Sequence, residues 1–301
     1  MPIKYEPETS TPRSVFHSFD PDVRPPVKRA PSGSCDAQIH VFGDLVRYPV
    51  RKAAVFEAPE AIFPAAQRMH SAMGIERCVI VQSTVYGDDH SCMLDALKEG
   101  GDQYRGVAII DDATSDQELN RLHDAGVRGA RFNFFKGVNM ITDPSQFRRA
   151  IERIAEMGWF AKVHPATGEF LDLFDLLKPL KLPVLVDHYG RPGQPSIADP
   201  AVQAITELMK AGNWWMMISN PHRFSHDPAG WNDMIPLARA YIDAAPSRVV
   251  WASDWPHPLS LTKVPNDADL IEFLYRATDD SEQQSILVNN PETLFGFADD
   301  A

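Results

Sequence analysis

The stretch Val249-Val250-Trp251-Ala252-Ser253-Asp254-Trp255-Pro256-His257-Pro258 decides the fold, because it joins a short apolar run to an acidic residue. Turn-forming residues at 246–248 precede the run, and Pro256 stops it. A run of this length between such residues is typical of a buried strand with Asp254 at its carboxyl end. Taken alone, Asp254 is as readily a cap of the following turn, so its role depends on what the other strands carry.

Strand-like and helix-like segments alternate along the chain on both sides of this stretch. We expect strands at 35–43, 77–82, 104–110, 126–133, 160–164, 182–188, 213–219 and 249–254, and helices at 59–73, 90–99, 115–125, 144–157, 169–177, 199–211, 231–244 and 267–277. Eight strand-helix pairs predict parallel strands that close into an α/β fold, the (β/α)8 TIM barrel. An open, doubly wound sheet is the alternative, but no GxGxxG motif follows a strand.

The length and composition fit one barrel domain preceded by an arm. The chain has 301 residues, of which 44% are hydrophobic, and this is enough to bury a full core. Residues 1–34 are rich in Pro, Ser and charge, and we expect them to form an N-terminal arm that packs on the surface or is partly disordered. This arm lacks the apolar core of a signal peptide. The barrel is expected over residues 35–301, and no window approaches the roughly 20 apolar residues of a membrane span.

Charge and cysteine content restrict the partners and the compartment. The formal net charge is −12, with the acidic residues dispersed, which argues against nucleic acid or an anionic membrane as a partner. A small anionic ligand would therefore need arginines or lysines placed locally. Cys35, Cys78 and Cys92 form neither a CxxC pair nor a disulfide framework, so we expect a reducing compartment and a cytoplasmic location. The oligomeric state is left open.

Five predicted strands carry, at their carboxyl ends, polar side chains of the types that serve in catalysis and binding. They are His40, Arg131, His164, His188 and Asp254. In a (β/α)8 barrel the carboxyl ends of the strands form the rim that carries the active site. Separate structural roles for all five residues are improbable, so we interpret them as one site. On the first strand, the period of two also places Asp36, Gln38 and His40 on one face.

Several of these segments resemble the amidohydrolase superfamily. They are Asp-Ala-Gln-Ile-His (36–40), Arg-Phe-Asn-Phe-Phe-Lys (131–136), Val-Asp-His-Tyr-Gly-Arg-Pro (186–192), Ser-Asp-Trp-Pro-His-Pro (253–258) and Asn-Asn-Pro-Glu-Thr-Leu-Phe (289–295). The likeness runs from about residue 33 to residue 297. It points to the lactonase branch of amidohydrolase-related family 2, which includes 2-pyrone-4,6-dicarboxylate lactonase and D-galactarolactone isomerase. The resemblance implies a distorted TIM barrel, a single domain with its active site at the rim, and hydrolysis of a lactone.

Two departures from the family pattern concern the metal. Members that bind metal begin with His-x-His on the first strand, whereas this chain has Gln38-x-His40, and an amide oxygen is a poor zinc ligand. Arg131 stands where binuclear members keep an acidic or carboxylated ligand. A fixed cation there would repel a divalent ion by several kcal/mol at an effective dielectric of about 20. We therefore expect no metal cofactor; the alternative keeps one zinc ion on His40, His164, His188 and Asp254.

The expected chemistry is metal-independent hydrolysis of an ester bond. Asp254 would act as the general base toward water, and His40, His164 or His188 would donate hydrogen bonds to the carbonyl oxygen, as in an oxyanion hole. The alternatives are a lactone isomerase and a zinc-dependent decarboxylase of the same superfamily.

The substrate is expected to be a small carboxylated or polyhydroxylated lactone. Arg131, Lys136 and Arg223 are the cations expected to bind its anionic groups, and Arg191 lies in a neighbouring loop. Gln38 on the first strand, and Thr84 and Tyr86 after the second, are further candidates for substrate contacts.

Overall fold

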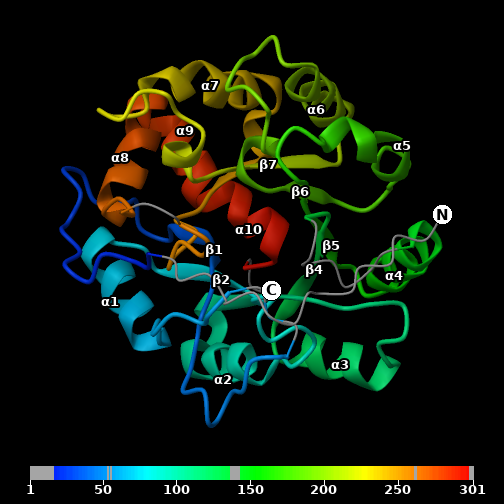
Figure 1. Ribbon diagram of the computed structural model, residues 1–301. Helices are drawn as coiled ribbons and strands as arrows, with labels where there is room; N and C mark the ends of the chain where they lie inside the picture. Colours follow the sequence, from blue (N-terminus) through cyan, green and yellow to red (C-terminus); the bar gives the residue numbers. More distant parts are fainter. Residues whose placement is uncertain (1–16, 53, 55, 136–142, 261–262, 298–301) are drawn as a thin grey trace.

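Eight parallel strands form a ring in which each strand pairs with the next along the chain. The computed structural model describes residues 17–52, 54, 56–135, 143–260 and 263–297. The strands are β1 (Cys35–Ile39), β2 (Arg77–Val81), β3 (Tyr104–Ala108), β4 (Val127–Asn133), β5 (Phe160–His164), β6 (Val184–Val186), β7 (Trp214–Ile218) and β8 (Val249–Trp251). The fold is therefore the predicted (β/α)8 barrel, and the open-sheet alternative is wrong (Figure 1).

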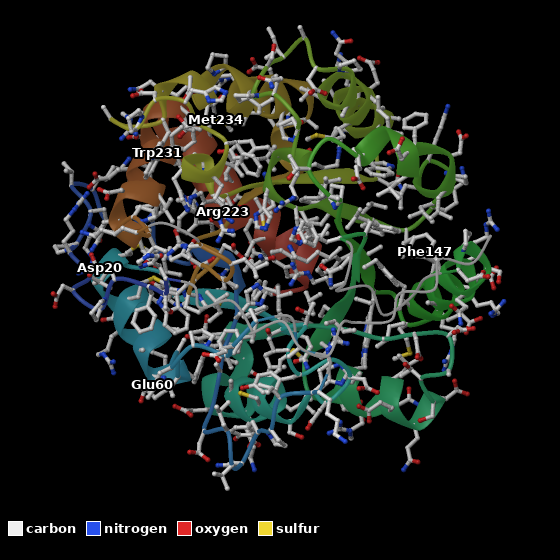
Figure 2. All side chains as sticks on the ribbon, viewed as in Figure 1. Asp20, Glu60, Phe147, Arg223, Trp231 and Met234 are labelled. Atoms are coloured by element: carbon white, nitrogen blue, oxygen red, sulfur yellow. The ribbon has the colours of Figure 1, made fainter. Side chains whose placement is uncertain are left out.

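Helices surround the strands and bury one apolar face each. They are α1 (Phe63–Met73), α2 (Ser91–Gly100), α3 (Asp116–Asp124), α4 (Pro144–Glu156), α5 (Phe174–Leu177), α6 (Pro200–Ala211), α7 (Ile235–Ala244) and α8 (Asp267–Ala277). The chain then adds α9 (Asp280–Gln284), a π-helical turn at Ser285–Asn289 and α10 (Asn290–Phe295). On α4, for example, Phe147 and Ile154 are buried, and Phe147 is labelled in Figure 2.

The ring closes between β8 and β1 just beyond the end of β8. Ile39 forms a parallel bridge with Trp255, the backbone N–H of Asp254 donates to the carbonyl of Gln38 at 3.1 Å, and that of His40 donates to Trp255 at 2.7 Å. Closure thus fixes Asp254 directly beside the first strand.

The interior of the barrel is apolar toward the amino-terminal ends of the strands. Its buried cluster consists of Cys35, Ala37, Val79, Val81, Val107, Phe160, Leu185, Trp215, Met217, Val250, Ala252 and Phe295. Phe295 comes from α10, which lies in the middle of the ring of helices in Figure 1. Because this end is filled with side chains, the polar residues meet at the opposite end, here called the barrel mouth.

Some element boundaries differ from the sequence expectation. The helix expected at 169–177 is a 3-10 helix (Phe170–Leu173) followed by one short turn, α5. The carboxyl end at Leu177 is the expected one, so the difference lies in the 3-10 geometry of the first residues. The helix expected from 231 begins as a 3-10 turn, because Trp231 has a left-handed backbone at φ 59°. Strands β6 and β8 also end early, so His188 and Asp254 lie on the loops that follow them.

The predicted common face of β1 is interrupted. The pairing of β1 with β2 shifts register between Asp36 and Ile39, and a bulge of this kind changes which side the next side chains face. Asp36 therefore turns away from Gln38 and His40: its Oδ2 accepts from Ser253 Oγ at 2.5 Å and lies 3.2 Å from Nε2 of His70 on α1. The expectation that Asp36 shares one face with Gln38 and His40 is wrong.

The described part of the arm, residues 17–34, packs across α1 and α8. The N–H of Ala30 donates to Met73 at 3.0 Å, Arg24 pairs with Glu272 at 2.7 Å, and the N–H of His17 donates to the carbonyl of Ser260 at 2.8 Å. Residues 1–16 of the predicted arm lie outside the described residues. Across the described ranges, no helix combines the length and apolarity needed to span a bilayer.

Candidate active site

The carboxylate of Asp254 is buried at the barrel mouth and held by three side chains. Its Oδ1 accepts from Nε2 of Gln38 and lies 3.5 Å from Nε2 of His40, and its Oδ2 accepts from Nδ2 of Asn220 at 2.6 Å. Burial raises the pKa of Asp254, but His188 and the hydrogen bond from His40 outweigh it and bring the pKa well below 3.8. Asp254 is therefore ionised, as a general base must be.

His40 faces this carboxylate through Nε2, and a second contact orients its ring. Its Nδ1 lies 2.8 Å from the carbonyl oxygen of Val81. Because a carbonyl only accepts, Nδ1 carries a proton, and a hydrogen bond from Nε2 to Asp254 requires a second proton on the ring. His40 thus lies next to Asp254 and directs its Nε2 to that carboxylate.

His188 stands on the turn after β6 and is neutral. Its Nδ1 lies 2.7 Å from Ser219 Oγ and 3.3 Å from Nδ2 of Asn220. The amide of Asn220 is oriented by its bond to Asp254, so its Nδ2 donates to His188 and leaves the ring proton on Nε2. Burial, the largest cause, lowers the pKa of His188 to about 4.

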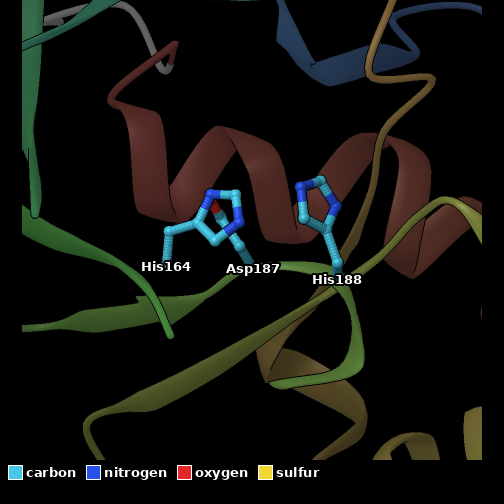
Figure 3. A group of neighbouring side chains, drawn as sticks. All are labelled: His164, Asp187 and His188. Atoms are coloured by element: carbon cyan, nitrogen blue, oxygen red, sulfur yellow. The ribbon is translucent and has the colours of Figure 1, made fainter. Parts of the chain in front are cut away.

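His164, Asp187 and His188 form a compact group, and their side chains are drawn in Figure 3. One ligand atom from each lies within 4.8 Å of the others, and the rings of His164 and His188 meet edge to face with centroids 5.2 Å apart. The zinc set proposed as an alternative, with His40 and Asp254, does not coincide with this group. Among the described residues, His164, Asp187 and His188 are the group whose ligand atoms lie close enough together to hold a metal ion.

Two cations occupy the flanks of this group. Lys162 on β5 is fully buried, and its Nζ lies 2.6 Å from Oδ1 of Asp187. Arg131 on β4 donates from Nη2 to Nδ1 of His164 at 2.6 Å, and the same nitrogen lies 3.8 Å from Oδ2 of Asp187. Burial, followed by the charge of Arg131, holds the pKa of His164 well below 6.5, so this imidazole is neutral.

Three arginines surround the mouth, and each guanidinium has an Nε atom without a hydrogen-bond partner among the described residues. Arg223 donates from Nη2 to the carbonyl of Pro258 at 2.6 Å, and Arg191 donates to Thr167 at 2.9 Å. The Nε atoms of Arg131, Arg191 and Arg223 are buried and have no hydrogen-bond partner among the described residues. Arg223 is labelled near the middle of the molecule in Figure 2.

The remaining predicted contacts are placed less centrally. Gln38 is beside Asp254, with its Oε1 buried and unpartnered in the described part of the chain. Thr84 is 9% exposed after β2. The hydroxyl of Tyr86 accepts from the N–H of Gly43 at 3.2 Å, which ties it to the loop after β1. Lys136 lies outside the described residues.

Sequence reasoning assigned no role to three residues that the fold places in the site: Lys162, Asp187 and Asn220. A lysine in the middle of an apolar five-residue strand is a signal, because alternation puts Lys162 on the same face as His164. Asp187 and Asn220 directly follow strands, as catalytic side chains of a barrel do. Their pairings join different strands, however, and local patterns do not report such contacts.

The chain is similar to a known protein family and to several curated enzymes. Residues 35–297 match the family model described as Amidohydrolase. A 2-pyrone-4,6-dicarboxylate hydrolase of Comamonas testosteroni is 34% identical and covers 90% of this chain and 92% of its own length. A 4-sulfomuconolactone hydrolase of Hydrogenophaga intermedia is 32% identical, covering 88% and 89%, and a D-galactarolactone isomerase of Agrobacterium fabrum is 28% identical, covering 88% and 91%.

A solved structure agrees with the fold. The crystal structure of a putative 2-pyrone-4,6-dicarboxylic acid hydrolase from Pseudomonas putida superimposes with a TM-score of 0.77 at 26% identity, over 88% of this chain and 98% of the other. The two chains therefore share the same barrel fold over most of their length.

Proposed function

The chain belongs to the amidohydrolase family, a family of enzymes, and we propose that it hydrolyses the ester bond of a small anionic lactone without a bound metal ion. The observation that carries this proposal is the carboxylate of Asp254, ionised and held between Gln38, His40 and Asn220. Two related enzymes named as lactone hydrolases are more than 30% identical over most of the chain, which supports the reaction class.

The proposed reaction begins with water beside Asp254. Asp254 takes a proton as the water oxygen attacks the lactone carbonyl, and negative charge develops on the carbonyl oxygen. The Nε2–H groups of His164 and His188 donate to that oxygen. The ring C–O bond then breaks, Asp254 returns its proton to the leaving oxygen, and the product is a hydroxy acid. His40 keeps the base in place.

The side chains around the group of metal-binding spacing suit a divalent ion poorly. Asp187 is already paired with Lys162, and Nδ1 of His164 accepts a hydrogen bond from Arg131. A divalent ion in this group would lie beside two fixed cations, each repelling it by several kcal/mol at an effective dielectric of about 20. At Asp254, the amide nitrogen of Gln38 already occupies Oδ1 as a donor. These contacts support the metal-independent mechanism, and we derive no step through zinc.

The arginines support an anionic substrate. The unpartnered Nε atoms of Arg131, Arg191 and Arg223 are donors that burial removes from water, and leaving such donors without an acceptor costs free energy. A carboxylate or sulfonate offers the acceptors they lack, and arginine binds a planar carboxylate through two parallel hydrogen bonds. We expect Thr84 and Tyr86 to add substrate contacts, and we keep Lys136 as a candidate from the sequence alone.

The proposed setting is the cytoplasm. Cys35, Cys78 and Cys92 are free and buried, as a reducing compartment allows. A small molecule is the expected partner, and the net charge of −12 makes nucleic acid an improbable one.

A panel of lactones read by proton release tests this function, run with and without exhaustive chelation. Hydrolysis of a neutral ester bond to a carboxylate releases one proton, whereas isomerisation between lactones releases none. We expect proton release that chelation leaves unchanged, with carboxylated or sulfonated lactones as the best substrates. Activity that chelation abolishes and zinc restores would favour the zinc enzyme, and product formation without proton release would favour the isomerase.

A further inference from the structure

The buried ammonium of Lys162 is the feature of the site that the mechanism above leaves unused. It lies on β5 below His164 and is fully buried. Its contacts are Oδ1 of Asp187 at 2.6 Å and the sulfur of Met217 at 3.4 Å. Removing both partners of such an ion pair from water costs several kcal/mol per charge, so a buried pair is weak evidence for stability alone. The pair must be judged by what it does to its neighbours.

The neighbour most affected is Nδ1 of His164. This atom accepts a hydrogen bond from Arg131 at 2.6 Å, so it carries a lone pair, and it lies 3.4 Å from Oδ2 of Asp187. A lone pair beside a carboxylate is unfavourable, because a carboxylate next to imidazole ordinarily accepts a proton from it. The arrangement is stable only if other groups take up the negative charge of Asp187.

We propose that Lys162 is a positioning residue that neutralises Asp187 and thereby keeps the proton of His164 on Nε2, directed to the substrate. Arg131 supplies the donor to Nδ1, and Lys162 removes the carboxylate as a competing acceptor. The consequence for catalysis rests on the proposed function, in which Nε2–H of His164 donates to the developing oxyanion. Lys162 itself touches no reacting atom.

Loss of the ammonium should therefore move a proton. In Lys162→Met, a side chain of similar length lies beside Met217 without charge, and Asp187 loses its 2.6 Å ion pair and keeps Arg131, at 3.8 Å, as a cationic neighbour. The carboxylate then draws a proton onto Nδ1 of His164, and the hydrogen bond from Arg131 is lost. Neutral His164 presents a lone pair at Nε2 and no longer donates to the oxyanion.

Nitrogen-15 NMR of labelled protein without substrate reads this directly, with the His164 signals assigned by their absence in His164→Gln. We expect Nε2–H in the wild type and protonated Nδ1 in Lys162→Met at pH 8. The double variant Lys162→Met/Asp187→Asn removes the carboxylate as well and should restore Nε2–H. Met217→Leu changes the packing at Lys162 without altering charge, and should leave the His164 signals as in the wild type.

The value of kcat should depend on whether His164 carries its proton on Nε2. We expect kcat of Lys162→Met to fall about 100-fold at nearly unchanged KM, the size of effect seen when one oxyanion donor is removed, and the double variant to recover at least tenfold. Wild-type His164 signals in Lys162→Met, or protonated Nδ1 in the double variant, would overturn the proposal. If the single variant does not fold, the double variant, which lacks both members of the Lys162–Asp187 pair, decides by the same signals.

This outcome is separate from that of the proposed function, because the NMR measurement needs neither substrate nor turnover. Wild-type activity that required zinc would refute the metal-free mechanism and leave the tautomer result standing. Unchanged His164 signals would refute the role of Lys162 and leave chelation-resistant hydrolysis standing.

Discussion

The two ends of this barrel are built from the same eight strands and differ in almost every physical respect. At the amino-terminal end, Phe295 of α10 packs against Phe160 of β5 with ring centroids 5.4 Å apart, in an apolar cluster. At the mouth, His188, Asn220 and Asp254 are buried polar residues with left-handed backbones, at φ 49°, 55° and 62°. Such backbones cost about 1 to 3 kcal/mol each in non-glycine residues, and persist where the surrounding structure holds them.

This difference assigns separate tasks to the two ends. The apolar end raises the free energy of unfolding through burial. The mouth lowers it, because charged groups are held close together and away from water there. Variants at the mouth should therefore lower activity more than stability, and variants at the amino-terminal end should do the reverse. The predictions below test that division.

The largest effect is expected from Asp254→Asn. The amide cannot take a proton from water, so kcat should fall by about 10² to 10⁴-fold, the usual contribution of a general base. The side chains have nearly the same shape, and an amide flip at Gln38 or Asn220 can restore the hydrogen bonds. Turnover on the lactone panel and a thermal melt measure the two effects. Full activity of Asp254→Asn on every substrate would disprove the role of Asp254.

The matching change at the other end is Phe295→Ala. Removing a buried phenylalanine from a filled core costs about 3 to 5 kcal/mol, so we expect the free energy of unfolding to fall by that amount. The kcat and KM of the folded fraction should stay within about twofold, since Phe295 is separated from the mouth by the barrel interior. Urea denaturation and kinetics at low temperature measure both. A large change in kcat with intact folding would show that the two ends are coupled.

Arginine substitutions compare the ends with one residue type. The Nε atoms of Arg223 at the mouth and of Arg248, which precedes β8, are both buried and unpartnered in the described part of the chain. Arg223→Gln should raise KM for an anionic lactone about 30-fold or more, the value of one hydrogen bond to a charged group. Arg248→Gln, whose wild-type Nη2 donates to Met209 at 2.9 Å, should leave KM unchanged. Equal effects on KM would remove the argument for Arg223 as a substrate-binding residue.

Acid titration should act on the mouth at lower pH than free histidine would suggest. The pKa of His188 is lowered to about 4 and that of Asp254 is well below 3.8, so both keep their catalytic forms down to about pH 4. We expect kcat/KM to be flat from pH 8 to pH 5 and to fall only near pH 4.

Stability should decline over a wider range. The unfolded chain protonates His188 near pH 6.5, so the unfolded state binds more protons and the contribution of His188 is lost as pH falls from 6.5 to about 4. The contribution of Asp254, whose folded pKa is depressed, is present above pH 3.8 and is lost as pH falls through its folded pKa. A pH-rate profile and thermal melts separate the two, and an activity midpoint near pH 6.5 would contradict the assignment of His188 as neutral.

Local sequence signals predict some parts of the structure, and contacts between distant strands decide the others. Strand β5 and helix α8 have the predicted boundaries, because Pro165 and the residues flanking 267–277 are local signals. The convergence of the strand ends follows from the barrel itself. His188 and Asp254 were expected on strands and lie on left-handed turns, since the tertiary contacts that hold such backbones leave no local pattern. The pair of Lys162 with Asp187 joins two strands, and only the closed barrel brings it together.

The smallest effect tests how firmly the arm supports the mouth. Ser260 accepts from Nη2 of Arg223 at 3.1 Å, and its backbone carbonyl accepts from the arm at His17. In Ser260→Ala the shorter bond from Arg223 to Pro258 remains, so the guanidinium is loosened by one neutral acceptor, worth about 1 kcal/mol. KM for an anionic lactone should rise about threefold to fivefold with kcat unchanged. Ser32→Ala, which removes an arm hydroxyl bonded to Glu76 away from the mouth, is the control and should change neither constant. A drop in kcat for Ser260→Ala would mean that Arg223 acts on the transition state as well as on substrate binding, because a group that only binds substrate changes KM alone.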